Sequence, residues 1–188
     1  MDLKRLRQET AAEHSGTEET VPLMREDLTR AMYVECLRRF YRVVRAWDAW
    51  CDKNAPADLI PLLKGRRRAT LLADDLQFLG GSGPIGDLAN SMDVTIPGDA
   101  RSIFLGRMYV MEGSTLGGQY IAAHVEEKLG LSHGLGDSYF VGYGAETSTR
   151  WQEFRSVLTA LDETQADTVI DAAKQMFTIF RIAMNESL

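Results

Sequence analysis

The chain has 188 residues, of which 45% are hydrophobic, and a formal net charge of −6. Its acidic balance argues against nucleic acid as the main partner, because phosphate binding needs a clustered positive surface. The length suits one compact domain over residues 1–188, and without a signal-peptide core or the roughly 18 apolar residues of a membrane span we expect a soluble, cytoplasmic protein.

The first predicted helix begins near Asp2, a plausible N-cap. One face carries, at spacings of three and four, Leu3, Leu6, Arg7, Thr10 and His14. We therefore expect His14 to point inward, where a lone histidine is more often a satisfied core residue than a metal ligand. Gly16 weakens the helix and Pro22 ends or bends it, which predicts a short element.

A second helix opens at Asp27 or Thr29. Its apolar stripe at helical spacing consists of Tyr33, Leu37, Phe40, Val44, Trp47 and Cys51. This aromatic stripe indicates core packing more than a cofactor box. Cys36 and Cys51 lack C-x-x-C spacing, so we expect them to be reduced core thiols. The segment from Ala55 to Pro61 ends the helix.

A third helical stretch is predicted to start at a basic cluster, Lys64-Gly65-Arg66-Arg67-Arg68, and to run to Leu79. This cluster is the densest positive charge in an acidic chain. It is either a solvated helix start or a docking site for an acidic electron donor. Residues 80–98 are rich in Gly, Ser, Asn, Asp and Pro, which predicts a surface connection with room for one helical turn.

The longest apolar pattern follows Asp99, which we expect to cap a long buried helix. This helix contains Gly113, Gly117 and Gly118, each of which costs roughly 1 kcal/mol relative to alanine. Either a broad, flat ligand lies directly on the backbone, or the glycines form a seam where two helices pack closely. The glycines alone leave both interpretations open.

Two further helices complete the pattern. Thr149 and Gln152 resemble a capping box ahead of the first, and Asp162 and Gln165 start the last. The segment 131–144 combines glycines with three aromatic residues, which predicts a loop held by aromatic contacts. Because no long stretch alternates with period two, the predicted fold class is all-α, without internal repeats.

Two motifs together resemble the heme oxygenase family. The first is Leu6-Arg7-Gln8-Glu9-Thr10-Ala11-Ala12-Glu13-His14 with Glu18; the second is Glu112-Gly113-Ser114-Thr115-Leu116-Gly117-Gly118-Gln119. They stand in the expected order, and with a C-terminal Phe180-Arg181 the resemblance spans nearly the whole chain. It implies a single-domain helical bundle that holds heme between a proximal N-terminal helix and a kinked, glycine-rich distal helix.

On the proximal side, the resemblance implies that His14 is the axial iron ligand. Glu18, or the adjacent Glu19, would hold the outer nitrogen of that imidazole. Arg7 lies two turns before His14, about 10 Å along the axis, and would pair with a heme propionate, although a solvated surface cation is the alternative. The expected cofactor-binding residues are Arg7, Thr10, Glu18 and Arg181.

On the distal side, the resemblance implies that heme is cleaved with O2 and electrons to biliverdin, carbon monoxide and ferrous iron. The expected catalytic residues are Gly113, Ser114, Gly117 and Gly118. Ser114 stands where many family members have an aspartate, and a hydroxyl can hold a water but cannot supply a carboxylate's charge. Glu112 is rotated about 200° from Ser114 on the helix, so it cannot simply substitute.

The implied cofactor is heme b, which is also the substrate. The implied partners are O2 and an electron donor such as ferredoxin, flavodoxin or an NADPH-dependent reductase, with a bilin-binding photoreceptor as a further candidate. A heme-binding or heme-carrying protein without turnover is the alternative, and Ser114 favours it. A helical metalloprotein with carboxylate and histidine ligands would need repeated E-x-x-H pairs, and His124 and His133 lack that spacing.

Overall fold

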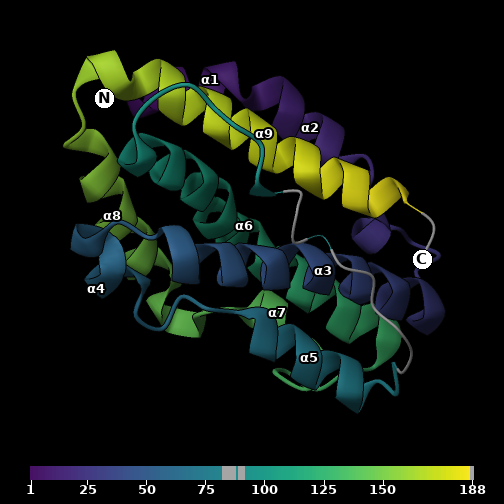
Figure 1. Cartoon of the computed structure of the whole chain (residues 1–188). Coiled ribbons are helices and arrows are strands. Elements are labelled where there is room, and N and C mark those ends of the chain that lie inside the picture. The colour runs from purple at the N-terminus through teal and green to yellow at the C-terminus, as the bar shows by residue number, and fades with distance from the viewer. Residues whose placement is uncertain (82–87, 89–91, 187–188) are drawn as a thin grey trace.

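The computed structural model describes residues 1–81, 88 and 92–186. Helices are arranged in layers around a shared apolar core, and none of these residues forms a strand (Figure 1). The prediction of an all-α fold is therefore confirmed. Within the predicted connection at residues 80–98, residues 82–87 and 89–91 lie outside the described residues.

The first helix is divided into two short pieces. α1 (Leu3–Glu9) is capped by Asp2, whose side chain accepts a hydrogen bond from the Lys4 amide, and α2 (Ala11–Glu18) follows directly. A 3-10 turn, η1 (Pro22–Met24), comes after the predicted break. Both helices lie along the last helix, α9 (Ala166–Asn185), as the purple and yellow ribbons show (Figure 1).

The second predicted helix is α3 (Arg30–Asn54), and Thr29 rather than Asp27 is its N-cap. Its aromatic stripe lies in the hydrophobic core, as expected. Cys36 and Cys51 are buried free thiols, which confirms that part of the prediction. Beyond Ala55 the chain forms η2 (Ala57–Leu59) and α4 (Ile60–Leu63).

The third helix begins later than predicted. α5 spans Ala69–Phe78, because the basic cluster forms a turn in which Gly65 has a φ of +71°. Arg66 and Arg68 are only 4% and 3% exposed, so for these two residues both the solvated helix start and the exposed docking site are wrong. Their side chains point into the bundle, where later elements supply partners.

The predicted long helix is α6 (Ala100–Leu129), which continues through all three glycines. Asp99 caps it, accepting a hydrogen bond from the Ser102 amide at 2.9 Å, and Gly130 ends it with a φ of +65°. Its most extensive contact is with α9, and it also packs against the two helices that follow it in the chain. α6 therefore forms the centre of the bundle.

The remaining elements are α7 (Ser138–Val141), η4 (Gly144–Glu146), α8 (Thr147–Thr159) and η5 (Glu163–Gln165). The capping box at Thr149 is wrong, because α8 begins two residues earlier and Thr149 lies in its first turn. The predicted start at Asp162 and Gln165 is confirmed, since the two residues form a capping box on η5, which leads directly into α9. The aromatic residues Tyr139 and Phe140 are buried, as expected for the anchored segment.

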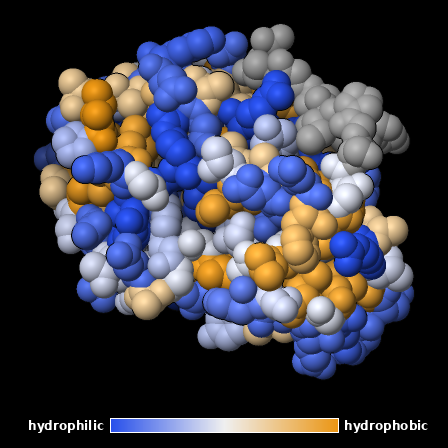
Figure 2. Space-filling model, turned by 90° about the horizontal axis from the view of Figure 1, so that it is seen from below, coloured by the Kyte–Doolittle hydropathy of each residue, from blue (hydrophilic) through white to orange (hydrophobic). Residues whose placement is uncertain are grey.

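The surface mixes hydrophilic and apolar side chains. Seen from below, on the side of α5 and α7, apolar patches lie between hydrophilic ones (Figure 2). Phe78 and Leu135 are about half exposed, at 53% and 51%. Among the described residues, no helix is both long enough and apolar enough to cross a membrane.

Candidate functional site

His14 lies at the surface of α2, beside α9. Its ring meets the ring of Phe177 edge-on, with the centroids 5.6 Å apart, and its side chain is 55% exposed. The expectation that His14 points inward is wrong, because Phe177 fills the space beneath it. The imidazole is consequently held against an aromatic ring on one side and accessible from the other.

Glu18 is the partner of this imidazole. Its Oε2 lies 3.3 Å from Nδ1 of His14, one turn along the same helix. A carboxylate there favours a proton on Nδ1 and leaves Nε2 as the nitrogen that can coordinate a metal. The structure thus brings His14 together with Glu18, as the sequence suggested, rather than with Glu19.

Arg7 and Thr10 lie where the N-terminal helix approaches α6. Thr10 is buried and donates a hydrogen bond to the Leu6 carbonyl at 2.8 Å. Burial raises the pKa of Tyr109 on α6, while Thr10 and the charge of Arg7 act in the opposite direction. Thr10 is thus buried close to Tyr109 of α6, and Arg7 is an exposed cation at the same end.

Arg181 is an exposed residue of α9 that reaches across to α2. A Cβ added at Gly16 would lie 3.5 Å from Nη1 of Arg181, so the missing side chain leaves room for the guanidinium. Thr17 also joins these helices, donating to the carbonyls of Glu13 and Phe177 at 2.8 and 3.3 Å. The structure places Arg181 beyond His14, at the opposite end of α2 from Arg7.

Gly113 and Gly117 form an open strip of backbone on α6. A Cβ at Gly117 would meet nothing within 4 Å, and one at Gly113 would meet only the ring of Trp151, at 3.9 Å. Residues four apart share a helix face, so the two glycines lie one above the other. Leu116 and Tyr120 beside them are 39% and 77% exposed. This bare, partly apolar face suits a flat ligand.

Gly118 has a different environment from its neighbour. A Cβ there would lie 2.7 Å from the carbonyl oxygen of Phe140, closer than real Cβ contacts come. Its expected place in the catalytic wall is therefore corrected: Gly118 faces the core and allows α6 and α7 to approach closely. The close-packing interpretation is thus confirmed for Gly118, whereas the ligand interpretation stays a prediction for Gly113 and Gly117.

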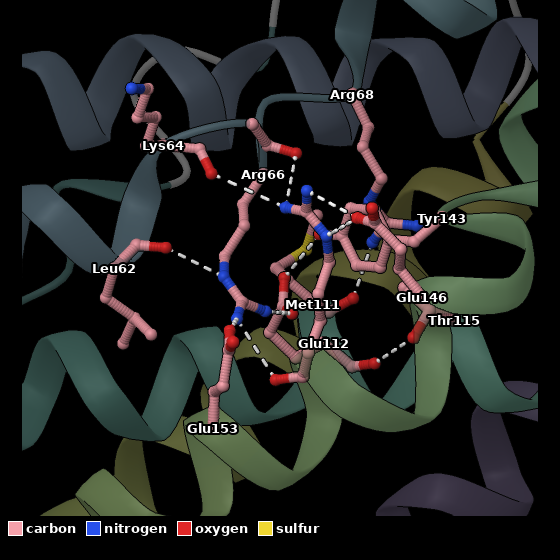
Figure 3. A network of polar contacts seen from close by, with 12 residues as sticks. Leu62, Lys64, Arg66, Arg68, Met111, Glu112, Thr115, Tyr143, Glu146 and Glu153 are labelled. Atoms are coloured by element: carbon pink, nitrogen blue, oxygen red, sulfur yellow. Dashed lines mark hydrogen bonds and ion pairs between the residues drawn. The ribbon is translucent and has the colours of Figure 1, made fainter.

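Ser114 lies at the exposed side of α6 with a buried arginine behind it. Its hydroxyl donates to the Met111 carbonyl at 2.8 Å and accepts from Nη2 of Arg68 at 3.3 Å. Arg68 also donates to the Met111 carbonyl, at 2.5 Å (Figure 3). Its guanidinium lies 4.9 Å from the centre of the Tyr139 ring. No local pattern in the sequence indicated this contact, apart from the basic cluster itself.

Glu112 lies on the opposite side of α6, in a buried polar network. It is 2% exposed, accepts a hydrogen bond from Tyr143 at 2.8 Å and pairs with Arg66 (Figure 3). Arg66 also contacts Glu153 at 3.0 Å and the Leu62 carbonyl at 2.7 Å. Burial raises the pKa of the Tyr143 hydroxyl. The Glu112 carboxylate is thus engaged elsewhere and does not replace the carboxylate that Ser114 lacks.

Comparisons with known proteins agree on one family. The family model described as heme oxygenase matches residues 2–186. A heme oxygenase from Xanthomonas campestris is 28% identical over 162 residues, covering 81% of this chain and 88% of that protein.

Among solved structures, the heme oxygenase from Leptospira interrogans has a TM-score of 0.77 at 20% identity, covering 97% of each chain. The NO- and CO-bound heme oxygenase from Neisseria meningitidis also has a TM-score of 0.77, at 22% identity. The match covers 96% of this chain and 88% of that chain. Heme oxygenase-1 from Synechocystis, in complex with heme, has a TM-score of 0.73 at 18% identity. The match covers 97% of this chain and 90% of that chain. These structural likenesses show a shared fold.

Proposed function

Because the chain belongs to the heme oxygenase family, we propose that it cleaves heme oxidatively to biliverdin, carbon monoxide and ferrous iron. One observation carries this proposal beyond family membership. An accessible histidine oriented by Glu18 stands on α2, and α6 carries a strip of bare glycine backbone. A planar macrocycle with a central iron needs both features, an axial nitrogen and a flat surface without side chains.

Heme b fits the residues present. His14 would hold the iron through Nε2, since Nδ1 is engaged by Glu18, and Arg7 and Arg181 would pair with the propionates. Bound heme would supply an iron that activates dioxygen, and the macrocycle itself would be the substrate. Phe177 supports the imidazole from beneath and keeps its ring plane fixed.

On the distal side, the chain's own residues leave room and hold water. Gly113 and Gly117 place no side chain over the ligand surface. The Ser114 hydroxyl has its proton directed to Met111 and is held there by Arg68, so it offers an acceptor lone pair to a water molecule. We infer that such a water, rather than a carboxylate, relays protons in this protein.

The reaction consumes electrons and therefore needs an external donor. A ferredoxin, a flavodoxin or an NADPH-dependent reductase meets this need, and a bilin-binding photoreceptor is a candidate acceptor of the product. The burial of Arg66 and Arg68 removes two of the four cations of the basic cluster from any docking site. The two buried free thiols support a cytoplasmic location, where cysteines stay reduced.

A single turnover with added hemin tests the proposal. With a reductant and O2, an oxygenase turns the solution green as biliverdin forms, and product chromatography identifies the isomer. The alternative, a heme carrier without turnover, is favoured by the missing distal carboxylate at Ser114. A solution that binds hemin and stays heme-coloured would establish the carrier and refute the oxygenase.

The axial ligand is tested in the same assay. His14→Ala should abolish the imidazole-type heme spectrum, because no other ring nitrogen replaces Nε2 in that position. His124→Ala is the matched control, since His124 is half-buried on α6 and contacts the Arg25 carbonyl at 3.1 Å. An unchanged spectrum in His14→Ala would overturn the assignment.

A further inference from the structure

A second cluster of metal-ligating side chains lies at the C-terminal end of α6. Glu126 of α6 and His133 and Asp137 of the following turn each offer a ligand atom, and these atoms all lie within 4.8 Å of one another. Nδ1 of His133 is 2.7 Å from Oε1 of Glu126. Neither the family resemblance nor the site around His14 involves these residues.

Asp137 is the unusual member of this cluster. Its side chain is fully buried, yet neither carboxylate oxygen has a hydrogen-bond partner of normal geometry among the described residues. The Gly134 amide and the Glu126 carboxylate are its polar neighbours, and neither donates a hydrogen bond of normal geometry to it. A buried ionised carboxylate without a partner is strongly unfavourable, so either a proton or a cation has to compensate this charge.

Asp75 is a buried carboxylate of the same protein that, unlike Asp137, has hydrogen-bond donors around it. It lies on α5 and accepts hydrogen bonds from the Ser138 and Tyr139 amides, both at 2.9 Å, and from the Ser138 hydroxyl at 2.7 Å. These three donors compensate its burial. Asp137 immediately precedes them in the chain, but its own carboxylate faces Glu126 and His133.

The charge around Asp137 is negative. Glu126 is a second carboxylate of the cluster, and Asp75 on α5 is also close to Asp137. Among the described residues, the ion pairs of this cluster include no lysine or arginine, and His133 is the only cationic candidate. Lys128, the nearest lysine in the chain, pairs with Glu26 instead. At neutral pH the pocket therefore attracts a cation.

We propose that Glu126, His133 and Asp137 form a binding site for a first-row divalent metal ion of the Zn2+ type. One imidazole nitrogen and two carboxylate oxygens are ligands that such ions accept, with water in the remaining position. Bonds of about 2.0–2.2 Å place tetrahedral ligand atoms about 3.4 Å apart, so only a small closure of the cluster is needed. His133 is 72% exposed, which gives the ion access from solvent.

A bound ion would join the end of α6 to the turn that leads into α7. This is the same α7 whose Phe140 carbonyl packs against Gly118. The site would thus hold α7, which packs against the inner face of α6. It lies outside the strip formed by Gly113 and Gly117. It does not depend on whether the protein cleaves heme.

Calorimetric titration with Zn2+ at pH 7.5 tests the proposal, supported by Co2+ absorption to report the coordination. His14 beside Glu18 is a second place where Zn2+ could bind, so the titration uses the heme-free His14→Ala protein as its background. We expect one bound ion per chain. At a Zn2+ concentration about 100 times Kd, the melting temperature should rise by about 5–10 °C.

Two variants decide whether the ion is in this cluster. His133→Ala removes an exposed side chain with little effect on folding and should weaken binding at least about tenfold. Asp137→Asn should abolish the Zn2+ response, while the metal-free variant melts at or above the parent temperature because the unpaired charge is gone. His124→Ala, on the same helix but outside the cluster, should bind as the parent does. Absent Zn2+ binding, or binding that survives both variants, would overturn the proposal.

Discussion

The two faces of α6 make different use of the same residue type. Gly117 and Gly118 are adjacent in sequence, yet a Cβ at Gly117 would meet open space and one at Gly118 would meet the Phe140 carbonyl at 2.7 Å. Consecutive residues are about 100° apart on a helix, so one step moves a side chain from the open face to the packed one. A glycine in an apolar helix can therefore leave the backbone open to a ligand or allow another element to pack closely. Its neighbours in space decide between the two.

The polar residues of the same motif divide in the same way. Glu112 is buried and paired with Arg66, whereas Ser114 is exposed and only its acceptor side is free for solvent. The arginines follow this division, since Arg66 and Arg68 are buried and Arg7 and Arg181 are exposed. The inner face therefore determines stability, and the outer face is where we expect binding and chemistry.

The largest effect is expected at the inner face, from Glu112→Gln. This change leaves the buried Arg66 with only the half-exposed Glu153 as a carboxylate partner, so the free energy of unfolding should fall by about 3–5 kcal/mol. Urea unfolding of the heme-free protein measures it. Loss below 1 kcal/mol would show that the inner network contributes little to stability.

Two further variants make this measurement specific. Glu146→Gln removes the acidic partner of Arg150 in an exposed helix pair and should lower stability by less than about 1 kcal/mol. The double variant Arg66→Met with Glu112→Gln should recover part of the loss, because no unpaired charge is left in the interior.

The next effect concerns Gly118. Gly118→Ala inserts a methyl group against the Phe140 backbone and should destabilise the protein by about 1–3 kcal/mol. Gly117→Ala is the matched control one residue away, and it should stabilise the helix by up to about 1 kcal/mol because its Cβ meets nothing. Thermal unfolding compares the two, and equal melting temperatures would remove the distinction between the faces.

Substitutions on the outer face of α6 should affect turnover more than stability, in contrast to Gly118→Ala. Gly113→Ala and Gly117→Ala place a methyl group on the proposed heme surface and should lower the rate of biliverdin formation by up to about 100-fold while folding is kept. Leucine at either position should lower it further, because its side chain would occupy the oxygen site. Parent-like turnover together with lost stability would refute the ligand interpretation of this strip.

The smallest effects are expected at the exposed cations. Arg7→Gln or Arg181→Gln removes one proposed propionate partner and should weaken heme binding by about 1 kcal/mol or shift the biliverdin isomer, with no change in melting temperature. Heme titration and product chromatography measure these outcomes. If both single variants bind and cleave heme as the parent does, other residues hold the propionates.

The sequence by itself determined the elements and the motifs. Helical periodicity and the caps Asp2, Asp99 and Asp162 depend on neighbours a few residues apart, and the structure confirms them. The heme oxygenase motifs are similarly local in the chain, which is why the family and the all-α class could be recognised. The contact between His14 and Glu18 belongs to the same class, since it joins residues one helical turn apart.

Only the tertiary structure decided where the arginine, glycine and histidine side chains of the site lie and what they contact. Arg66 and Arg68 form a basic cluster in sequence, and their partners Glu112 and Met111 are more than forty residues away. Contacts of Gly118 with Phe140, of His14 with Phe177 and of Asp137 with Glu126 likewise join separate segments of the chain. The residues next to an arginine or a glycine in the sequence do not indicate its distant partner, because the two come into contact only when separate segments pack together.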